Sequence, residues 1–188
     1  MRSQLYLLAS WLFNQPTAEH LAVLQHLMTE LLQTTSSEVP WRETLIALKP
    51  QLKYEENRET EYSRLFILAF PNITVQPFGS YWLENDQCLM GRSTLEVKKM
   101  MAEHGIEIAE DTGFLPDHIV SELEFMALLA SQDNEKALQT QQQLLEQHLA
   151  LWIPRFIAAL RAANPASYYQ LAADFLEQLI EYEIRSIK

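Results

Sequence analysis

The chain has 188 residues, of which 48% are apolar, and this is enough to bury a core without disulfide or metal cross-links. A formal net charge of −11 disfavours binding to nucleic acid or to an anionic membrane surface, because phosphate contacts need clustered Lys and Arg. Its one cysteine, Cys88, excludes an internal disulfide and a cysteine-based zinc site, and we expect an ordinary thiol in a reducing cytoplasm.

The N-terminal third is predicted to be helical. Four Gly among 188 residues favour helices joined by short turns. Leu5, Leu8 and Leu12 have the spacing of an amphipathic core helix, so we do not expect a secretory signal or a membrane span here. Thr17 is placed to cap the second helix. The predicted helices cover residues 3–13, 18–33, 41–49 and 55–69.

The centre of the chain is predicted to be irregular over residues 70–87, where Pro and Gly interrupt the helical pattern. Ser93 and Glu96 have the spacing of a capping box, which predicts a helix that Gly105 ends. Asp117 is expected to cap the helix that follows it.

The remaining predicted helices cover residues 118–131, 134–151 and 165–185. Pro154 lies where a further helix starts or kinks, and Asn164 with Pro165 is expected to open the last one. No internal repeat is present. The fold class is therefore all-α, with residues 1–188 forming a single compact helical domain.

Catalytic motifs are absent from the sequence. It contains neither of the glycine-rich phosphate-binding patterns, and it lacks the G-x-S-x-G pattern of serine hydrolases. His118 and Glu122 are four residues apart on a predicted helix and could share a ligand with Asp117. A small helical metallohydrolase using these three residues is one alternative, and a hydrogen bond within the helix is the simpler one.

An aromatic segment is the most informative feature. Phe78, Tyr81 and Trp82 lie beside Pro77 and Gly79 rather than in a periodic helix. One interpretation is an apolar groove that binds a peptide. The other is a helical scaffold without such a site, in which aromatic side chains fill a gap between helices and are fully buried.

Asp117 has two interpretations as well. It is a helix cap, or it lies at the rim of the groove beside His118 and also attracts an arginine of the peptide.

Five segments together resemble the TorD/DmsD family of cytoplasmic chaperones, which mature molybdenum-containing reductases. They read EYSRLF (61–66), PFGSYWL (77–83), GRSTLEVKKMMAEHGIE (91–107), PDHIVSELEFMALLA (116–130) and HLALWIPRF (148–156). The resemblance covers about residues 5–182 and is strongest over 61–130. The second and third segments are more similar to the DmsD branch.

The resemblance implies a non-enzymatic, all-helical chaperone without a cofactor. Members of the family bind the twin-arginine signal peptide and the apo form of a molybdoenzyme catalytic subunit, and hold it back from export until its cofactor is inserted. A monomer is expected, although domain-swapped dimers occur in the family. Guanine nucleotide binding has been suggested for relatives, and this sequence offers no motif for it.

The resemblance also assigns a peptide site. It comprises Tyr62, Phe66, Phe78, Gly79, Ser80, Tyr81, Trp82, Pro116, Asp117 and His118. The family often has Trp where this chain has Tyr62, so an aromatic ring is retained there.

Overall fold

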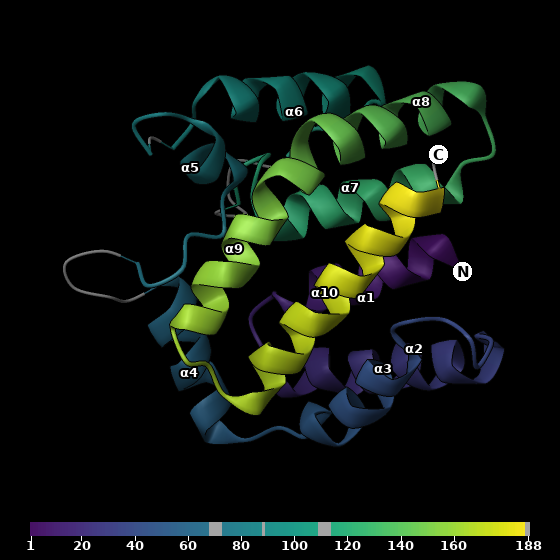
Figure 1. Cartoon of the computed structure of the whole chain (residues 1–188), viewed down its shortest axis with the longest axis vertical. Helices are drawn as coiled ribbons and strands as arrows, with labels where there is room; N and C mark the ends of the chain where they lie inside the picture. The colour runs from purple at the N-terminus through teal and green to yellow at the C-terminus, as the bar shows by residue number, and fades with distance from the viewer. Residues whose placement is uncertain (68–72, 88, 109–113, 187–188) are drawn as a thin grey trace.

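The computed structural model describes residues 1–67, 73–87, 89–108 and 114–186, and within them all regular structure is helical. The helices are α1 (Arg2–Leu12), α2 (Ala18–Thr34), α3 (Arg42–Leu48), η1 (Lys49–Leu52), α4 (Glu56–Phe66), α5 (Gly79–Leu83), α6 (Arg92–Glu103), α7 (Ile119–Ser131), α8 (Glu135–Leu144), η3 (Leu145–Leu149), α9 (Ala150–Ala162) and α10 (Ser167–Ser186). The all-α prediction is confirmed. Figure 1 shows α6 and α8 along one end of the molecule and α2 and α3 along the other. No helix among the described residues has both the length and the apolar character needed to cross a bilayer.

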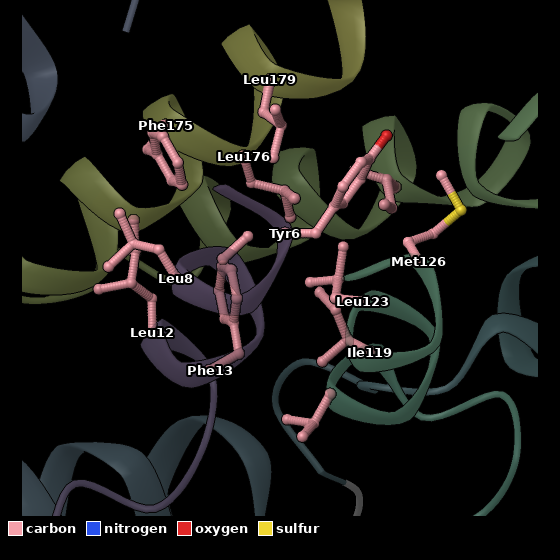
Figure 2. Close-up of a cluster of buried hydrophobic side chains, with 14 of the residues drawn as sticks. Tyr6, Leu8, Leu12, Phe13, Ile119, Leu123, Met126, Phe175, Leu176 and Leu179 are labelled. Carbon is pink, nitrogen blue, oxygen red and sulfur yellow. The ribbon is translucent and has the colours of Figure 1, made fainter. Parts of the chain in front are cut away.

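The core forms where α1, α7 and α10 meet (Figure 2). Tyr6 and Leu8 of α1, Leu123 of α7 and Leu176 of α10 all belong to this cluster, and all four side chains are buried. Burying such a side chain contributes about 1.5–3 kcal/mol, so this junction fixes the position of α7 in the molecule.

The two chain ends described by the structure are joined by a buried carboxylate. Glu183 of α10 accepts hydrogen bonds from Arg2 Nε at 3.0 Å and from the Tyr6 hydroxyl at 3.1 Å. The Glu183 side chain is almost fully buried, whereas Arg2 reaches solvent. The pair therefore attaches the start of α1 to the end of α10.

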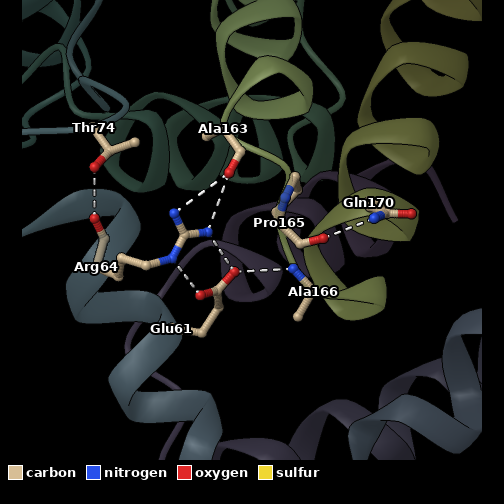
Figure 3. A network of polar contacts seen from close by, with 7 residues as sticks. All are labelled: Glu61, Arg64, Thr74, Ala163, Pro165, Ala166 and Gln170. Atoms are coloured by element: carbon tan, nitrogen blue, oxygen red, sulfur yellow. Dashed lines mark hydrogen bonds and ion pairs between the residues drawn. The ribbon is translucent and has the colours of Figure 1, made fainter.

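A second polar network attaches α4 to the turn between α9 and α10 (Figure 3). Glu61 Oε1 accepts the backbone N–H of Ala166 at 2.9 Å, which satisfies a free donor just before α10. Arg64 donates to both carboxylate oxygens of Glu61 and to the carbonyl of Ala163. This network fixes the helix that carries Tyr62.

The boundaries of two helices differ from the predictions. α6 begins at Arg92, and Ser93 does not form a capping box with Glu96; instead, its N–H and hydroxyl both donate to Glu84 Oε1, at 2.9 and 2.8 Å. These hydrogen bonds lower the pKa of Glu84. The last helix begins at Ser167 because Asn164 adopts a left-handed φ of 48° and ends the preceding turn.

Of the two possibilities predicted for Pro154, the start of a further helix was wrong. α8, η3 and α9 follow one another without interruption from Glu135 to Ala162, and Pro154 lies inside α9. The ring of a proline clashes with the carbonyl four residues earlier, here that of Ala150. η3 is a π-helical segment that ends immediately before Ala150, so the local change of helix geometry coincides with this constraint.

Candidate functional site

The two most distinctive segments of the sequence meet in the structure. Phe78 and His118 form an isolated antiparallel bridge. Gly79 N donates to the Asp117 carbonyl, and Ile119 N donates to the Pro77 carbonyl, both at 2.8 Å. The short helix α5 is therefore attached to the start of α7, although the two segments are separated by almost 40 residues in the chain.

Asp117 occupies a different place from the predicted one. Its side chain has 0% exposure, and Oδ2 accepts the N–H of Ser80 at 2.8 Å. Asp117 therefore caps α5, while His118 is the N-cap of α7, with Nδ1 accepting from Val120 N at 3.2 Å. The expectation that Asp117 caps the following helix was wrong, because His118 occupies that position. The carboxylate is buried rather than exposed at the rim of a groove, so the expected contact with an arginine has no support from this position.

His118 is a neutral ring that packs against two phenylalanine rings. Its ring lies between those of Phe114 and Phe78, with centroids 4.4 and 5.1 Å away. Burial lowers the pKa of His118 to about 3, so the imidazole is neutral at physiological pH. Pro116, which precedes Asp117 and His118 in the chain, is half-buried.

The aromatic residues of the α5 segment are partly exposed. Phe78, Tyr81 and Trp82 are each between the buried and exposed extremes, which contradicts the scaffold alternative that required Phe78 and Trp82 to be fully buried. The rings of Tyr81 and Trp82 meet edge to face at 5.0 Å, and Trp82 Nε1 donates to the Gln76 carbonyl at 2.9 Å. The orientation of Trp82 is thus fixed before any ligand binds.

Next to these rings is a surface depression of about 690 Å³, which we call the α5 hollow. Its lining consists of Tyr81, Trp82, Leu83, Glu84, Asn85, Asp86, Gln87, Arg155 and Ala158. The guanidinium of Arg155 donates to the Trp82 carbonyl. Leu151, with 51% exposure, is one turn before Arg155 on the same face of α9, so a further apolar side chain is exposed on this face outside the hollow lining.

Tyr62 and Phe66 do not line the α5 hollow. Each has only 6% exposure, and the ring of Phe66 packs on those of Phe156 and Tyr169 in the interior. Burial raises the pKa of the Tyr62 phenol. Neither side chain is exposed beside Trp82, because the inward face of α4 packs on α9 and α10, and their expected contact with a peptide stays a prediction.

A buried polar cluster beneath Gly79 was missed by the sequence analysis. Glu122 of α7 has 0% exposure; its Oε1 is 2.7 Å from His148 Nε2, and its Oε2 accepts from Trp152 Nε1 at 3.1 Å. Burial raises the pKa of Glu122. Burial alone would lower the pKa of His148, but the charge and the hydrogen bond of Glu122 outweigh burial and raise this pKa. The i, i+4 spacing of His148 and Trp152 was the available signal.

The metallohydrolase alternative receives no support from this geometry. Both oxygens of Glu122 have protein donors, His118 Nδ1 is used as a cap, and Asp117 Oδ2 holds α5. In the part of the chain that the structure describes, no three His, Cys, Asp or Glu side chains are grouped to hold a metal ion.

The chain matches a known protein family. The pattern of the family described as nitrate reductase delta subunit matches residues 35–158, which include α3 to α8 and most of α9. The matched region therefore contains α5, the start of α7 and the cluster beneath Gly79.

Individual relatives agree with this match. The Tat proofreading chaperone DmsD of Salmonella typhimurium is 36% identical over 105 residues, covering 55% of this chain and 48% of the relative. The chaperone protein TorD of Vibrio atlanticus is 24% identical over 148 residues, covering 73% and 69% of the two chains. The alignment with DmsD thus spans about half of the relative's length. Both relatives are named as chaperones, in agreement with the expectation of a non-enzymatic protein.

A solved structure extends the similarity to the whole fold. A putative redox enzyme maturation protein from Archaeoglobus fulgidus matches with a TM-score of 0.65 at 22% identity, covering 97% of this chain and 93% of the other. At this identity the similarity concerns the fold alone. The family match, which covers more than half of the chain, shows that the chain belongs to the nitrate reductase delta subunit family, and the similarity to TorD and DmsD agrees with it.

Proposed function

We propose that this protein is a cytoplasmic chaperone that binds the twin-arginine signal peptide of a molybdenum-containing oxidoreductase. It would hold the apo form of the catalytic subunit back from export until the cofactor is inserted. The name of the DmsD relative, a Tat proofreading chaperone, supports this activity for the present chain. We further propose that the protein acts as a single-domain monomer.

The observation that carries the proposal is the arrangement of α5. Phe78, Tyr81 and Trp82 are partly exposed on a short helix whose start is capped by Asp117. Partly exposed aromatic side chains in fixed orientations are typical anchors of peptide interfaces, where each contributes about 2 kcal/mol or more. Because their orientation is fixed beforehand, binding does not have to order them.

The α5 hollow suggests how the two parts of a signal peptide are bound. The apolar stretch, folded as a helix, lies on Trp82 and extends along α9 toward Leu151. Its basic start lies near Glu84 and Asp86, which line the hollow. Glu84 remains a carboxylate because its hydrogen bonds with Ser93 lower its pKa. We therefore assign recognition of the arginines to these acids rather than to the buried Asp117.

The ten predicted site residues then have three roles. Phe78, Tyr81 and Trp82 contact the peptide. A second group, formed by Gly79, Ser80, Pro116, Asp117 and His118, positions α5 against α7. The last two, Tyr62 and Phe66, support α9 from the interior.

Isothermal titration calorimetry with a twin-arginine signal peptide tests the proposal. We compare the natural peptide with one in which both arginines are glutamine, using the wild-type protein and Asp86→Asn. The two changes are expected to be coupled, with an interaction of about 0.5–1.5 kcal/mol that decreases as salt is added.

Asp133→Asn is the matched control, since Asp133 is an exposed acid in the turn between α7 and α8, outside the α5 hollow. This variant should bind both peptides as the wild type does. The absence of binding to the signal peptides of all molybdoenzymes encoded near this protein would refute the proposed function. Equal losses in Asp86→Asn and Asp133→Asn would show that only the overall negative charge attracts the arginines.

A further inference from the structure

The cluster beneath α5 leaves no room for a side chain at position 79. A Cβ atom added to Gly79 would be 2.7 Å from His148 Nε2 and 3.2 Å from both Glu122 Oε1 and Trp152 Nε1. The Gly79 backbone therefore rests directly on the hydrogen-bonded atoms of the cluster. The close contact requires glycine at this position. The backbone angle does not, since the φ of Gly79 is outside the left-handed region.

Two donors from one helix face bind the two oxygens of a single carboxylate. His148, in the π-helical segment η3, and Trp152, in α9, are four residues apart, and both point to Glu122 of α7. π-Helical segments are frequent at functional sites because the extra residue changes which side chains face inward. The cluster thus connects α7, η3 and α9 at one point below α5.

We propose that Glu122 and His148 are positioning residues for the peptide site. They hold α5 in the position in which Trp82 contacts the peptide. The inference rests on the proposed function for its role in binding, but the positioning itself can be observed without a peptide. Neither residue lines the α5 hollow, so they act through Gly79 and not by contact with a ligand.

Glu122 and His148 can exchange a proton with solvent, which an apolar support for α5 could not do. The charged groups that face it are Asp117, before α7, and Glu96 of α6; Asp117 raises the pKa values of both Glu122 and His148. The raised pKa of His148 contributes stability that is present below the ordinary imidazole pKa and is lost as the pH rises through the folded-state value. The support for α5 should therefore be weaker at pH 8.5 than at pH 6, because deprotonation of His148 removes its charge from the hydrogen bond with Glu122.

The experiment follows the indole N–H signals of Trp82 and Trp152 by ¹H–¹⁵N NMR between pH 6 and pH 8.5, without peptide. In the wild type both signals should shift along one titration curve, because the Trp152 indole donates to Glu122 and Trp82 lies on α5. The double variant Glu122→Gln, His148→Gln keeps an amide hydrogen bond but has no titrating proton, so both signals should be constant. His26→Gln, at an exposed position on α2, is the matched control and should titrate like the wild type.

A Trp82 signal that stays constant in the wild type, whether or not Trp152 shifts, would overturn the proposal. Gly79→Ala provides an independent variant, because it displaces α5 without removing the proton; a Trp82 signal unchanged from the wild type would likewise count against the proposal.

Peptide affinity is measured in parallel. It should fall at least threefold from pH 6.5 to pH 8.5 in the wild type and by less in the double variant, and an equal fall in both would contradict the positioning role. A wild-type protein that binds no signal peptide at any pH would refute the proposed function alone, since the indole signals still decide the present inference.

Discussion

Asp117→Ala should destabilise the protein by about 2 kcal/mol. The mutation removes the acceptor of the Ser80 N–H, which is 2.8 Å away in a fully buried site. Loss of a helix cap costs about 0.5–2 kcal/mol, and a buried amide left without a partner costs about 1–3 kcal/mol. Both free-energy costs describe the loss of the same hydrogen bond, so they are not added together. The other oxygen of Asp117 has no partner among the described residues, so its removal costs little.

Asp117→Asn keeps one acceptor oxygen and should cost less than about 1 kcal/mol. Because the carboxylate is fully buried, we expect Asp117→Asn to change the affinity for the twin-arginine peptide and for its glutamine version by the same factor. Urea unfolding followed by circular dichroism measures stability, and calorimetry measures the two affinities. An unfolding midpoint of Asp117→Ala equal to that of the wild type would refute the capping role. A loss confined to the arginine peptide would show that the charge of Asp117 reaches the ligand.

Three further predictions concern other parts of the molecule. Trp82→Ala should weaken signal-peptide binding by about 1–3 kcal/mol, as measured by calorimetry on a variant whose circular dichroism is unchanged; equal affinity would exclude Trp82 from the site. Glu183→Ala should lower the free energy of unfolding in urea by about 2 kcal/mol, because it leaves Arg2 without its carboxylate, and a loss below about 0.5 kcal/mol would contradict this. Glu61→Gln should cost about 0.5–1 kcal/mol at pH 7, since Glu61 is only partly buried. Hydrogen bonds from Arg64 and Ala166 lower the pKa of Glu61, so its contribution is present above the ordinary carboxyl pKa and is lost as the pH falls through the folded-state pKa; a cost that does not decrease between pH 7 and pH 3 would refute this sign.

The helices were predictable because their signals are local. For example, Leu21, Leu24 and Leu31 repeat with helical spacing and are all buried in α2, which differs from the predicted range of 18–33 by one residue. Thr17 accepts the N–H of His20 at 3.2 Å, so the predicted cap of this helix is confirmed. Both patterns involve residues close together in the chain, where backbone geometry decides which atoms can meet.

The errors concern partners that are distant in the chain. Ser93 has a local candidate in Glu96, yet it bonds to Glu84 across the turn between α5 and α6. In the same way, the partner of Asp117 is Ser80 rather than a residue of the following helix. A single sequence does not show which carboxylate reaches a free N–H once helices pack, so the buried state of Asp117 could not be predicted.

The candidate site was predictable only in part. Phe78, Gly79 and His118 were assigned to one site from the resemblance, and the structure brings them together. The spacing of His148 and Trp152 did not reveal their shared partner, because Glu122 is 26 residues before His148 and on another helix. Cys88 lies outside the described residues, so the expectation of an ordinary thiol stays a prediction.

The central claim is that the α5 face binds a twin-arginine signal peptide, and the indole signals of the four tryptophans test it directly. Trp82 is partly exposed beside the α5 hollow, whereas Trp41 is buried and Trp11 lies on α1. In a peptide titration at constant pH, the account predicts that the Trp82 signal shifts in proportion to the bound fraction while those of Trp11 and Trp41 stay fixed. Saturable peptide binding that leaves the Trp82 signal unchanged would contradict the account.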